Sequence, residues 1–263
     1  MKKTTKRLMA ALLPGVIFLA SALGAHADPT KVGIGAEPYP PFTSPDASGQ
    51  WVGWEIDMIH AVCAEAKLDC VVTPIAWDGL IPALQTKKID MIMNSLSITD
   101  ERKKVIDFSD KYTDKPSVIA GAKSETFDAS PQGLSGKILG LQTSTNYAAY
   151  AKKHFAGSVA EIKEYQTQDE ALQDLAAGRI DAVQADIVSL SDFHKTAAGK
   201  ECCDIKGKIA NDPAIMGVGQ GVGLRKGDTE LKDKINAAIK AVRANGTYAE
   251  ITKKYFDFDI YGQ

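Results

Sequence analysis

The chain has 263 residues, of which 44% are hydrophobic, 24% charged and 7% aromatic. This composition is typical of a folded globular protein and excludes a disordered or fibrous chain. Because a typical domain holds about 100 to 150 residues and a single core stops growing near 250 to 300, the length allows one or two domains, of which we favour two. The formal net charge of −2 at pH 7 provides no basic surface for phosphates. No zinc-finger, RNA-recognition or basic-helix motif occurs either, so nucleic acid is excluded as a partner.

The first 27 residues predict a secretory signal peptide. Four basic residues precede an apolar run from Leu8 to Leu23, and Ala25-His26-Ala27 matches the A-x-A pattern of a cleavage site. The apolar run is shorter than the roughly 20 residues that span a bilayer, so an uncleaved membrane anchor is the weaker interpretation. After cleavage, 27 Lys and Arg would face 33 Asp and Glu, a formal charge of −6. The sequence therefore predicts a mildly acidic protein of the periplasm.

Export gives the four cysteines a structural meaning, because disulfides persist in the periplasm. We expect Cys63 to pair with Cys70 across a short ring that follows a predicted helix. Cys202 and Cys203 are adjacent, and the sequence leaves open whether they form a vicinal disulfide or remain free thiols. We expect no cofactor. We also expect no metal site, because no zinc spacing links the cysteines to the scattered histidines His60, His154 and His194.

Short β-branched runs alternate with helix-length amphipathic segments along the rest of the chain. This pattern predicts an α/β fold with mostly parallel strands. In chain order we expect a strand at 32–34, a helix at 54–66, a strand at 71–75, a helix at 79–87, a strand at 89–93 and a last helix at 229–245 that stops at Gly246.

An internal echo is the most informative pattern at this level. The segment 84–92 resembles the segment 175–183, which lies 91 residues farther on. Two copies are too few for a solenoid, so we predict two lobes that share a helix, a tight turn and a strand. Ser95 and Asp186 then occupy equivalent places after the two strands. Ligands of open α/β sheets bind beyond the carboxyl ends of strands, so both side chains are expected at a cleft. The alternative is that they are ordinary polar residues at strand ends.

Two polar, proline-bearing connections flank the middle of the chain, at 111–116 and 211–213. We interpret them as paired crossovers between the lobes. The expected first lobe comprises residues 28–114 and 217–263, the second comprises 117–212, and the hinge comprises 115–116 and 213–216.

Two strand-to-helix junctions offer groups that could bind one carboxylate. Residues 97–102 follow a predicted strand and join hydroxylated helix caps to Arg102. Residues 141–146 have the same pattern in the second lobe, where a helix begins near Ser144 or Thr145. Hydroxyls, amides at a helix N-terminus and a guanidinium fork all bind anions. The alternatives are ordinary helix caps and a solvated arginine.

Two aromatic residues follow predicted strands at the same sheet end. Tyr39 follows the first strand and Trp77 a later one, so their rings could enclose a ligand side chain. Aromatic faces attract cations by roughly 0.5 to 2 kcal/mol, and Glu37 or Glu55 could neutralise the charge. The alternative is that these rings pack in the core or in loops, which is the favoured interpretation for Phe42.

These same segments resemble the periplasmic lysine/arginine/ornithine-binding and histidine-binding proteins of bacterial polar-amino-acid ABC importers, which belong to solute-binding protein family 3. The likeness covers essentially all of residues 28–263. It rests on Tyr39-Pro40-Pro41-Phe42, Leu80-Ile81-Pro82-Ala83-Leu84, the run 95–102 (Ser-Leu-Ser-Ile-Thr-Asp-Glu-Arg), the run 221–226 (Gly-Val-Gly-Leu-Arg-Lys), and Gly246-Thr247-Tyr248 leading to the run 254–258 (Lys-Tyr-Phe-Asp-Phe).

The resemblance implies a two-lobed periplasmic binding protein of the type II-like α/β fold. Each lobe would be a mostly parallel sheet flanked by helices, and two hinge crossovers would join the lobes. It further implies a monomeric receptor, not an enzyme, that captures a cationic L-amino acid by hinge closure and delivers it to an ABC permease in the inner membrane.

The resemblance also implies roles for single residues. Arg102, Ser97 and the amides of Ser144 and Thr145 would bind the ligand α-carboxylate. Asp186 and Ser95 would bind the α-ammonium. Tyr39 and Trp77 would stack on the ligand side chain, Glu55 would stand at the family's acidic side-chain position, and Cys63 and Cys70 match its disulfide.

Two departures from the family pattern bear on the ligand side chain. Asn94 stands where lysine/arginine binders carry Ser, and Glu37 lies beside the family's acidic position, which holds Ala36. Both are candidates for contact with the ligand. The ligand is left open among arginine, lysine, ornithine, histidine and an opine.

Two alternatives to transport remain at this level. Related folds also serve as periplasmic dehydratases and cell-wall lyases, which would need a general acid or base among the cleft carboxylates Glu37, Glu55 and Asp186. A sensor that docks on a separate membrane receptor is the other alternative.

Overall fold

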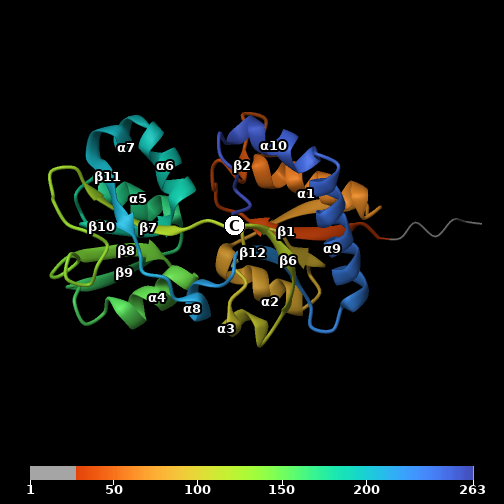
Figure 1. The fold of residues 1–263 in the computed structure, drawn as a ribbon, viewed down its shortest axis with the longest axis horizontal. Coiled ribbons are helices and arrows are strands. Elements are labelled where there is room, and N and C mark those ends of the chain that lie inside the picture. Colours follow the sequence, from red (N-terminus) through yellow and green to blue (C-terminus); the bar gives the residue numbers. More distant parts are fainter. Residues whose placement is uncertain (1–27, 263) are drawn as a thin grey trace, which may run out of the picture.

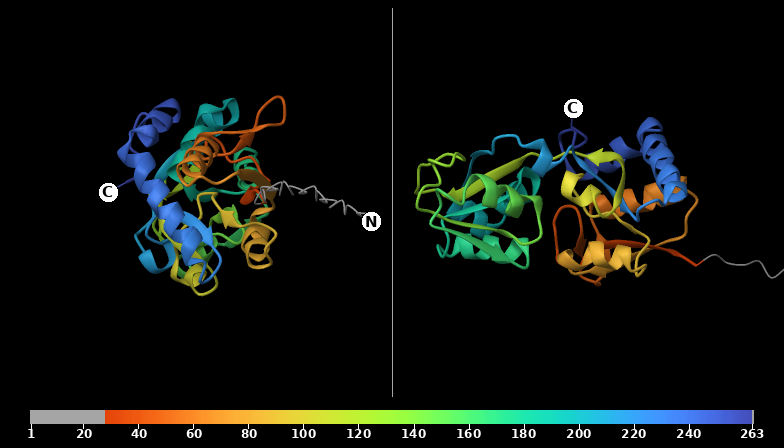
Figure 2. Two further views of the ribbon diagram at one scale, coloured as in Figure 1. Left: turned by 90° about the vertical axis from the view of Figure 1, so that its right-hand side faces the viewer. Right: turned by 90° about the horizontal axis from the view of Figure 1, so that it is seen from below.

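The computed structural model describes residues 28–262, and the predicted signal peptide and Gln263 lie outside the described residues. Two lobes lie side by side along the long axis of the molecule (Figures 1 and 2). Each lobe contains one five-stranded sheet covered by helices. No helix within residues 28–262 is long and apolar enough to cross a membrane.

The first lobe, on the right of Figure 1, is built on a sheet with the strand order β4-β1-β5-β12-β6. β1 pairs in parallel with both β4 and β5, whereas β12 pairs antiparallel with both β5 and β6. A small hairpin of β2 and β3 stands beside this sheet. The strands are β1 (Thr30–Gly35), β2 (Ser44–Pro45), β3 (Trp51–Val52), β4 (Cys70–Ile75), β5 (Met91–Ile92), β6 (Asp107–Thr113) and β12 (Gln220–Leu224).

The second lobe has a sheet with the strand order β11-β7-β10-β8-β9. β8 pairs in parallel with both β10 and β9, whereas β7 pairs antiparallel with both β10 and β11. The strands are β7 (Ser117–Ala122), β8 (Ile138–Gln142), β9 (Glu161–Tyr165), β10 (Ala182–Asp186) and β11 (Cys203–Lys208).

The helices fill the intervals between these strands. In the first lobe they are α1 (Trp54–Glu65), a 3-10 turn (Trp77–Gly79), α2 (Leu80–Gln85), α3 (Asp100–Lys103), α9 (Thr229–Ala244) and α10 (Thr247–Tyr255). In the second lobe and the return connection they are α4 (Asn146–His154), α5 (Gln168–Ala176), α6 (Ile187–Lys195), α7 (Ala197–Cys202) and α8 (Pro213–Met216).

The two-lobed α/β fold is as predicted, but the sheets are mixed rather than mostly parallel. All four antiparallel pairings within the two five-stranded sheets involve β7 or β12. These are the two strands by which the chain enters one lobe from the other. Parallel pairing needs a crossover helix within the same lobe, and neither of these strands is reached through one.

Each lobe has a buried apolar cluster of its own. Ile56, Ile59 and Cys63 of α1, which lie near one face of this helix, are buried. Trp54 begins that helix and is fully buried, and its indole N–H donates to Thr252 Oγ1 of α10 at 3.1 Å. A buried indole N–H usually needs such a partner, so this bond ties the C-terminal helix to the start of α1.

The internal echo corresponds to a real structural repeat. The helix ends at the same turn in both copies: Lys87 and Gly178 have φ values of 61° and 67°. In each copy an aspartate then accepts a hydrogen bond from the backbone of the neighbouring parallel strand. Asp90 bonds Lys31 of β1, and Asp181 bonds Ile138 of β8. The repeat therefore places Ser95 and Asp186, which follow β5 and end β10, at equivalent sheet ends.

Two segments carry the chain between the lobes. Residues 114–116 connect β6 directly to β7, and residues 209–219 lead from β11 through α8 to β12. The C-terminal end lies against the first of them, because Asp114 N donates to the carbonyl of Ile260 at 3.0 Å. The exact hinge positions stay a prediction.

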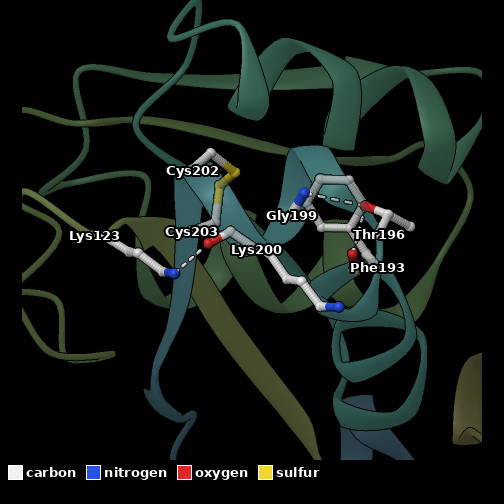
Figure 3. The surroundings of a disulfide bond; sticks show 7 residues. All are labelled: Lys123, Phe193, Thr196, Gly199, Lys200, Cys202 and Cys203. Atoms are coloured by element: carbon white, nitrogen blue, oxygen red, sulfur yellow. Dashed lines mark hydrogen bonds between the residues drawn. A yellow bond between two sulfur atoms is a disulfide. The ribbon is translucent and has the colours of Figure 1, made fainter.

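Both cysteine pairs are disulfides. Cys63 and Cys70 are joined as predicted, with their Cα atoms 6.2 Å apart, and fasten the end of α1 to β4. Cys202 and Cys203 also form a disulfide, which settles the alternative left open above. Figure 3 shows it at the junction of α7 and β11, where Lys123 donates to the carbonyl of Lys200.

Candidate functional site

A cavity that is partly open to solvent lies between the two lobes. It is at the carboxyl ends of β1, β5, β8 and β10, where the chain leaves each sheet. Its walls are Gly35, Glu37, Pro38, Tyr39, Trp77, Asn94, Ser95, Ser97 and Arg102 from the first lobe, and Gln142, Thr145, Asn146, Tyr147, Gln168 and Asp186 from the second. Nine of the eleven predicted ligand-binding residues are among them; Glu55 and Ser144 are not.

Arg102 supplies a positive charge to the first-lobe wall. Thr99 caps α3 and accepts the Arg102 backbone N–H, which fixes the start of the side chain. The guanidinium donates to the carbonyl oxygens of Ser97 at 3.1 Å and Ser144 at 3.4 Å, and it lies 5.5 Å from the Trp77 ring centroid. Burial lowers the pKa of Arg102 to about 10, so it stays protonated at neutral pH. Both of these acceptors are neutral, so the charge is free to pair with an anion.

Asp186 supplies a negative charge to the second-lobe wall. Its side chain is fully buried and caps α6, where Oδ1 accepts the amides of Val188 and Ser189 at 3.0 Å. Oδ2 accepts the Ser189 hydroxyl at 3.0 Å and the hydroxyl of Tyr39 from the other lobe. Burial raises the pKa of Tyr39 far above its usual range, and the negative charge of Asp186 is the second-largest contribution to this increase. All four donors to this carboxylate are neutral.

Glu37, Trp77 and Asn94 meet around Gly35 at the end of β1. Glu37 Oε1 accepts the Trp77 backbone N–H at 3.2 Å, and the Trp77 indole N–H donates to the carbonyl of Ser144 at 3.3 Å. A Cβ on Gly35 would lie 3.1 Å from Glu37 Oε2 and 3.3 Å from Asn94 Nδ2, so glycine leaves room for both side chains. Asn94 Oδ1 is buried without a hydrogen-bond partner. The glutamate and the asparagine together offer acceptors to a cation.

Glu55 lies behind the cavity wall rather than in it. It is fully buried in α1, and Oε1 accepts the Ser95 backbone N–H at 2.6 Å and the Tyr112 hydroxyl. Burial raises the pKa of Glu55, and the positive charge of Lys115 is the largest opposing influence. The sequence could not show this, because a glutamate beside a buried tryptophan at the start of a helix is exposed in most proteins.

Ser144 contributes its backbone to the site rather than its side chain. It precedes the cap of α4 with a left-handed φ of 58°, and its carbonyl accepts from both Trp77 and Arg102 of the first lobe. Thr145 lines the cavity, and its hydroxyl caps α4 by accepting from Ala148 N at 3.2 Å.

Several residues near the cavity were missed by the sequence reasoning. Asn146 joins the lobes, since its Nδ2 donates to Ser97 Oγ at 3.2 Å. Gln168 is the first residue of α5, whose N-terminus is capped by Thr167 and Glu170 in a capping box. The Thr-x-x-Glu spacing of 167–170 is a sequence signal for this helix start. Lys115 of the first crossover is 8% exposed and bonds the cavity residue Ser95. No sequence signal distinguishes a buried lysine from a solvated one.

Comparison with known proteins agrees with this arrangement. Residues 31–258 match the family described as bacterial extracellular solute-binding proteins, family 3. The chain belongs to this family. This solute-binding protein is 41% identical over 256 residues to the L-arginine-binding protein of Pseudomonas aeruginosa, covering 97% of each chain. It is 40% identical to the histidine-binding periplasmic protein of Salmonella typhimurium, covering 98% of this chain and 99% of the relative.

Solved structures resemble the solute-binding protein in the same way. An ancestral arginine-binding protein bound to arginine has a TM-score of 0.78 and 33% identity, with 86% of this chain and 97% of that chain covered. An ancestral amino acid-binding protein, named as a precursor of cyclohexadienyl dehydratase, has a TM-score of 0.75 and 31% identity, with 87% and 95% covered.

Proposed function

We propose that this protein is the periplasmic receptor of an amino-acid ABC importer. It captures a cationic L-amino acid, such as arginine, lysine, ornithine or histidine, between its lobes and delivers it to an inner-membrane permease. The observation that carries the proposal is the pair of opposite charges on facing walls of one cavity: Arg102 from the first lobe, Asp186 from the second. The names of relatives that bind arginine and histidine support it.

The ligand α-carboxylate pairs with the guanidinium of Arg102, with help from the Ser97 hydroxyl and the backbone amides near Thr145. A guanidinium fork matches the two oxygens of a carboxylate. The α-ammonium pairs with Asp186 and the hydroxyl of Ser95. A buried charge without a partner costs several kcal/mol. A zwitterion, whose carboxylate and ammonium pair with the two walls, is therefore favoured over a ligand that carries only one of these charged groups.

The ligand side chain extends between Tyr39 and Trp77 toward Glu37 and Asn94. The glutamate carboxylate and the unpartnered Asn94 Oδ1 are both hydrogen-bond acceptors. A carboxylate beside an unpartnered amide oxygen favours a ligand side chain that carries an ammonium, an imidazolium or a guanidinium. This is the reason to prefer a cationic ligand over a neutral one.

Closure of the lobes follows bending at residues 115–116 and 213–216, with the first lobe as 28–114 and 217–263 and the second as 117–212. The protein acts as a monomer in the periplasm and leaves its ligand chemically unchanged. Its cleft carboxylates all have roles as charge partners, which favours binding over catalysis.

A thermal-shift screen tests the proposal, because a ligand that binds only the folded state raises the melting temperature. The screen covers the twenty amino acids, ornithine and opines, and calorimetry then gives each dissociation constant. Tight binding of at least one cationic amino acid, recovered unaltered after incubation, supports the proposal. Binding of none of them refutes it.

A further inference from the structure

Lys115 carries a buried ammonium next to Ser95 and Tyr39 of the cavity wall. It lies between β6 and β7 and is 8% exposed. Its Nζ donates to Ser95 Oγ at 2.8 Å and to the Tyr39 hydroxyl at 3.5 Å. It also lies 3.8 Å from the ring centroid of Phe42 and 5.2 Å from that of Tyr39. Two oxygens and two aromatic rings therefore hold this charge in one place.

Ser95 connects this ammonium to Glu55. The Ser95 hydroxyl lies 3.2 Å from Glu55 Oε2, and the Ser95 backbone N–H donates to Oε1 at 2.6 Å. A serine hydroxyl has one hydrogen and two lone pairs. Its hydrogen points to Glu55 and one lone pair receives Lys115, which leaves a single lone pair for a ligand.

The charges around Lys115 are mainly negative and come from several elements. Glu55 of α1, Asp186 at the end of β10 and Asp114 of the same crossover are the carboxylates whose charges act on it. Burial lowers the pKa of Lys115, and these three carboxylates oppose that effect. Glu55 is in turn buried with Tyr112 and Lys115 as its partners. Lys115 is thus linked to Glu55 through Ser95, and Glu55 has hydrogen-bond partners without a ligand.

We propose that Lys115 is a specificity-determining residue whose ammonium occupies the acidic subsite of Ser95, Tyr39 and Glu55 and so excludes a second ligand ammonium from it. The inference rests on the proposed function. It leaves Glu37 as the carboxylate open to a ligand side chain. A ligand must therefore carry its second positive charge far from the α-carbon.

The distances define which ligands are excluded. If Ser95 Oγ accepts both Lys115 and a ligand α-ammonium at hydrogen-bond distance, the two nitrogens lie about 4 to 5 Å apart. The two nitrogens of 2,4-diaminobutyrate span about this separation, since four bonds join them. Norvaline is its neutral isostere, in which a methyl group replaces the second ammonium. The ratio of the affinities for these two ligands therefore measures the effect of the second ammonium alone, because their shapes are nearly the same.

The test is calorimetric binding of 2,4-diaminobutyrate and norvaline to the wild type and to Lys115→Ala. The wild type is expected to prefer diaminobutyrate by less than about tenfold. Lys115→Ala opens the subsite and leaves Glu55 without its cation. We expect the preference for diaminobutyrate, measured as the ratio of the two dissociation constants, to rise by about tenfold or more, because the ligand gains one charged hydrogen bond.

Three further variants separate specificity from folding. Lys115→Arg retains the cation and is expected to keep the wild-type ratio. The double variant Lys115→Ala with Glu55→Gln also removes the carboxylate. It is expected to lose the increased preference for diaminobutyrate that Lys115→Ala shows. Lys208→Ala is the matched control, because this exposed lysine at the end of β11 lines the same neighbouring cavity as Lys115.

Each outcome decides the proposal. It is overturned if folded Lys115→Ala keeps the wild-type ratio, or if the double variant shows the same gain as the single one. A wild type that already prefers diaminobutyrate more than about tenfold also overturns it, and this result needs no variant to fold. If the wild type binds no amino acid at all, the proposed function fails instead.

Discussion

Removing the guanidinium of Arg102 is the most direct test of how the ligand is held. Arg102→Ala removes the guanidinium from the cavity wall and leaves a ligand carboxylate without its charge partner. Two charge-assisted hydrogen bonds of about 1.5 to 2 kcal/mol each amount to about 3 to 4 kcal/mol. At about 1.4 kcal/mol per decade, the dissociation constant should rise by two to three decades.

The assay is isothermal titration with the best ligand from the thermal-shift screen. Arg102→Lys should recover only part of the loss, because a lysine keeps the charge but cannot form the two-pronged bond. Lys103→Ala is the matched control, since this neighbour on α3 is half exposed and pairs only with Asp100 at 3.4 Å; it should bind as the wild type does. An unchanged dissociation constant in a folded Arg102→Ala would refute the carboxylate assignment.

Three further predictions concern charge and stability. Asp186→Asn should raise the dissociation constant of the ligand by about one to two decades. The melting temperature should change little, because asparagine caps a helix as well as aspartate does. A large drop in melting temperature together with the weaker binding would contradict this prediction. Replacing Cys63 and Cys70 by Ser should cost about 2 to 3 kcal/mol, a drop of about 5 to 10 °C in a calorimetric scan. Hydrogen bonds from Tyr165, Lys163 and Arg179 hold the pKa of Asp174 far below its usual range. This carboxylate therefore stabilises the fold above its unfolded pKa of about 3.9, and the stabilisation is lost as the pH falls toward the lowered value. Urea unfolding at pH 7 should give a lower free energy of unfolding for Asp174→Asn than for the wild type. The difference between the two free energies should decrease below a pH of about 4.

Local patterns predicted the elements that depend on neighbouring residues. The first long helix was expected at 54–66 and is Trp54–Glu65, and the last was expected at 229–245 and is Thr229–Ala244. Gly246 adopts the left-handed φ of 89° that ends α9. The echo of two segments was enough to place Ser95 and Asp186 at matching sheet ends, because a repeated turn repeats its geometry.

Features set by distant parts of the chain could not be predicted. Glu55 was expected at the ligand, yet hydrogen bonds from Ser95 and from Tyr112 of β6 hold it behind the cavity wall. Lys115 was assigned only to a hinge, because its partners lie 20 and 76 residues away along the chain. The mixed sheets were missed for the same reason, since local periodicity does not reveal which lobe a strand joins.

The position of β12 has a consequence for how the molecule assembles. This strand comes from residues 220–224, yet it lies inside the first sheet, between β5 and β6. β6 has no other neighbour in that sheet, so it stays unpaired until the last fifth of the polypeptide has been synthesised. All strands of the second sheet lie within residues 117–208 and need no such late arrival. A chain truncated before residue 220 would therefore keep one lobe's sheet intact and leave the other split.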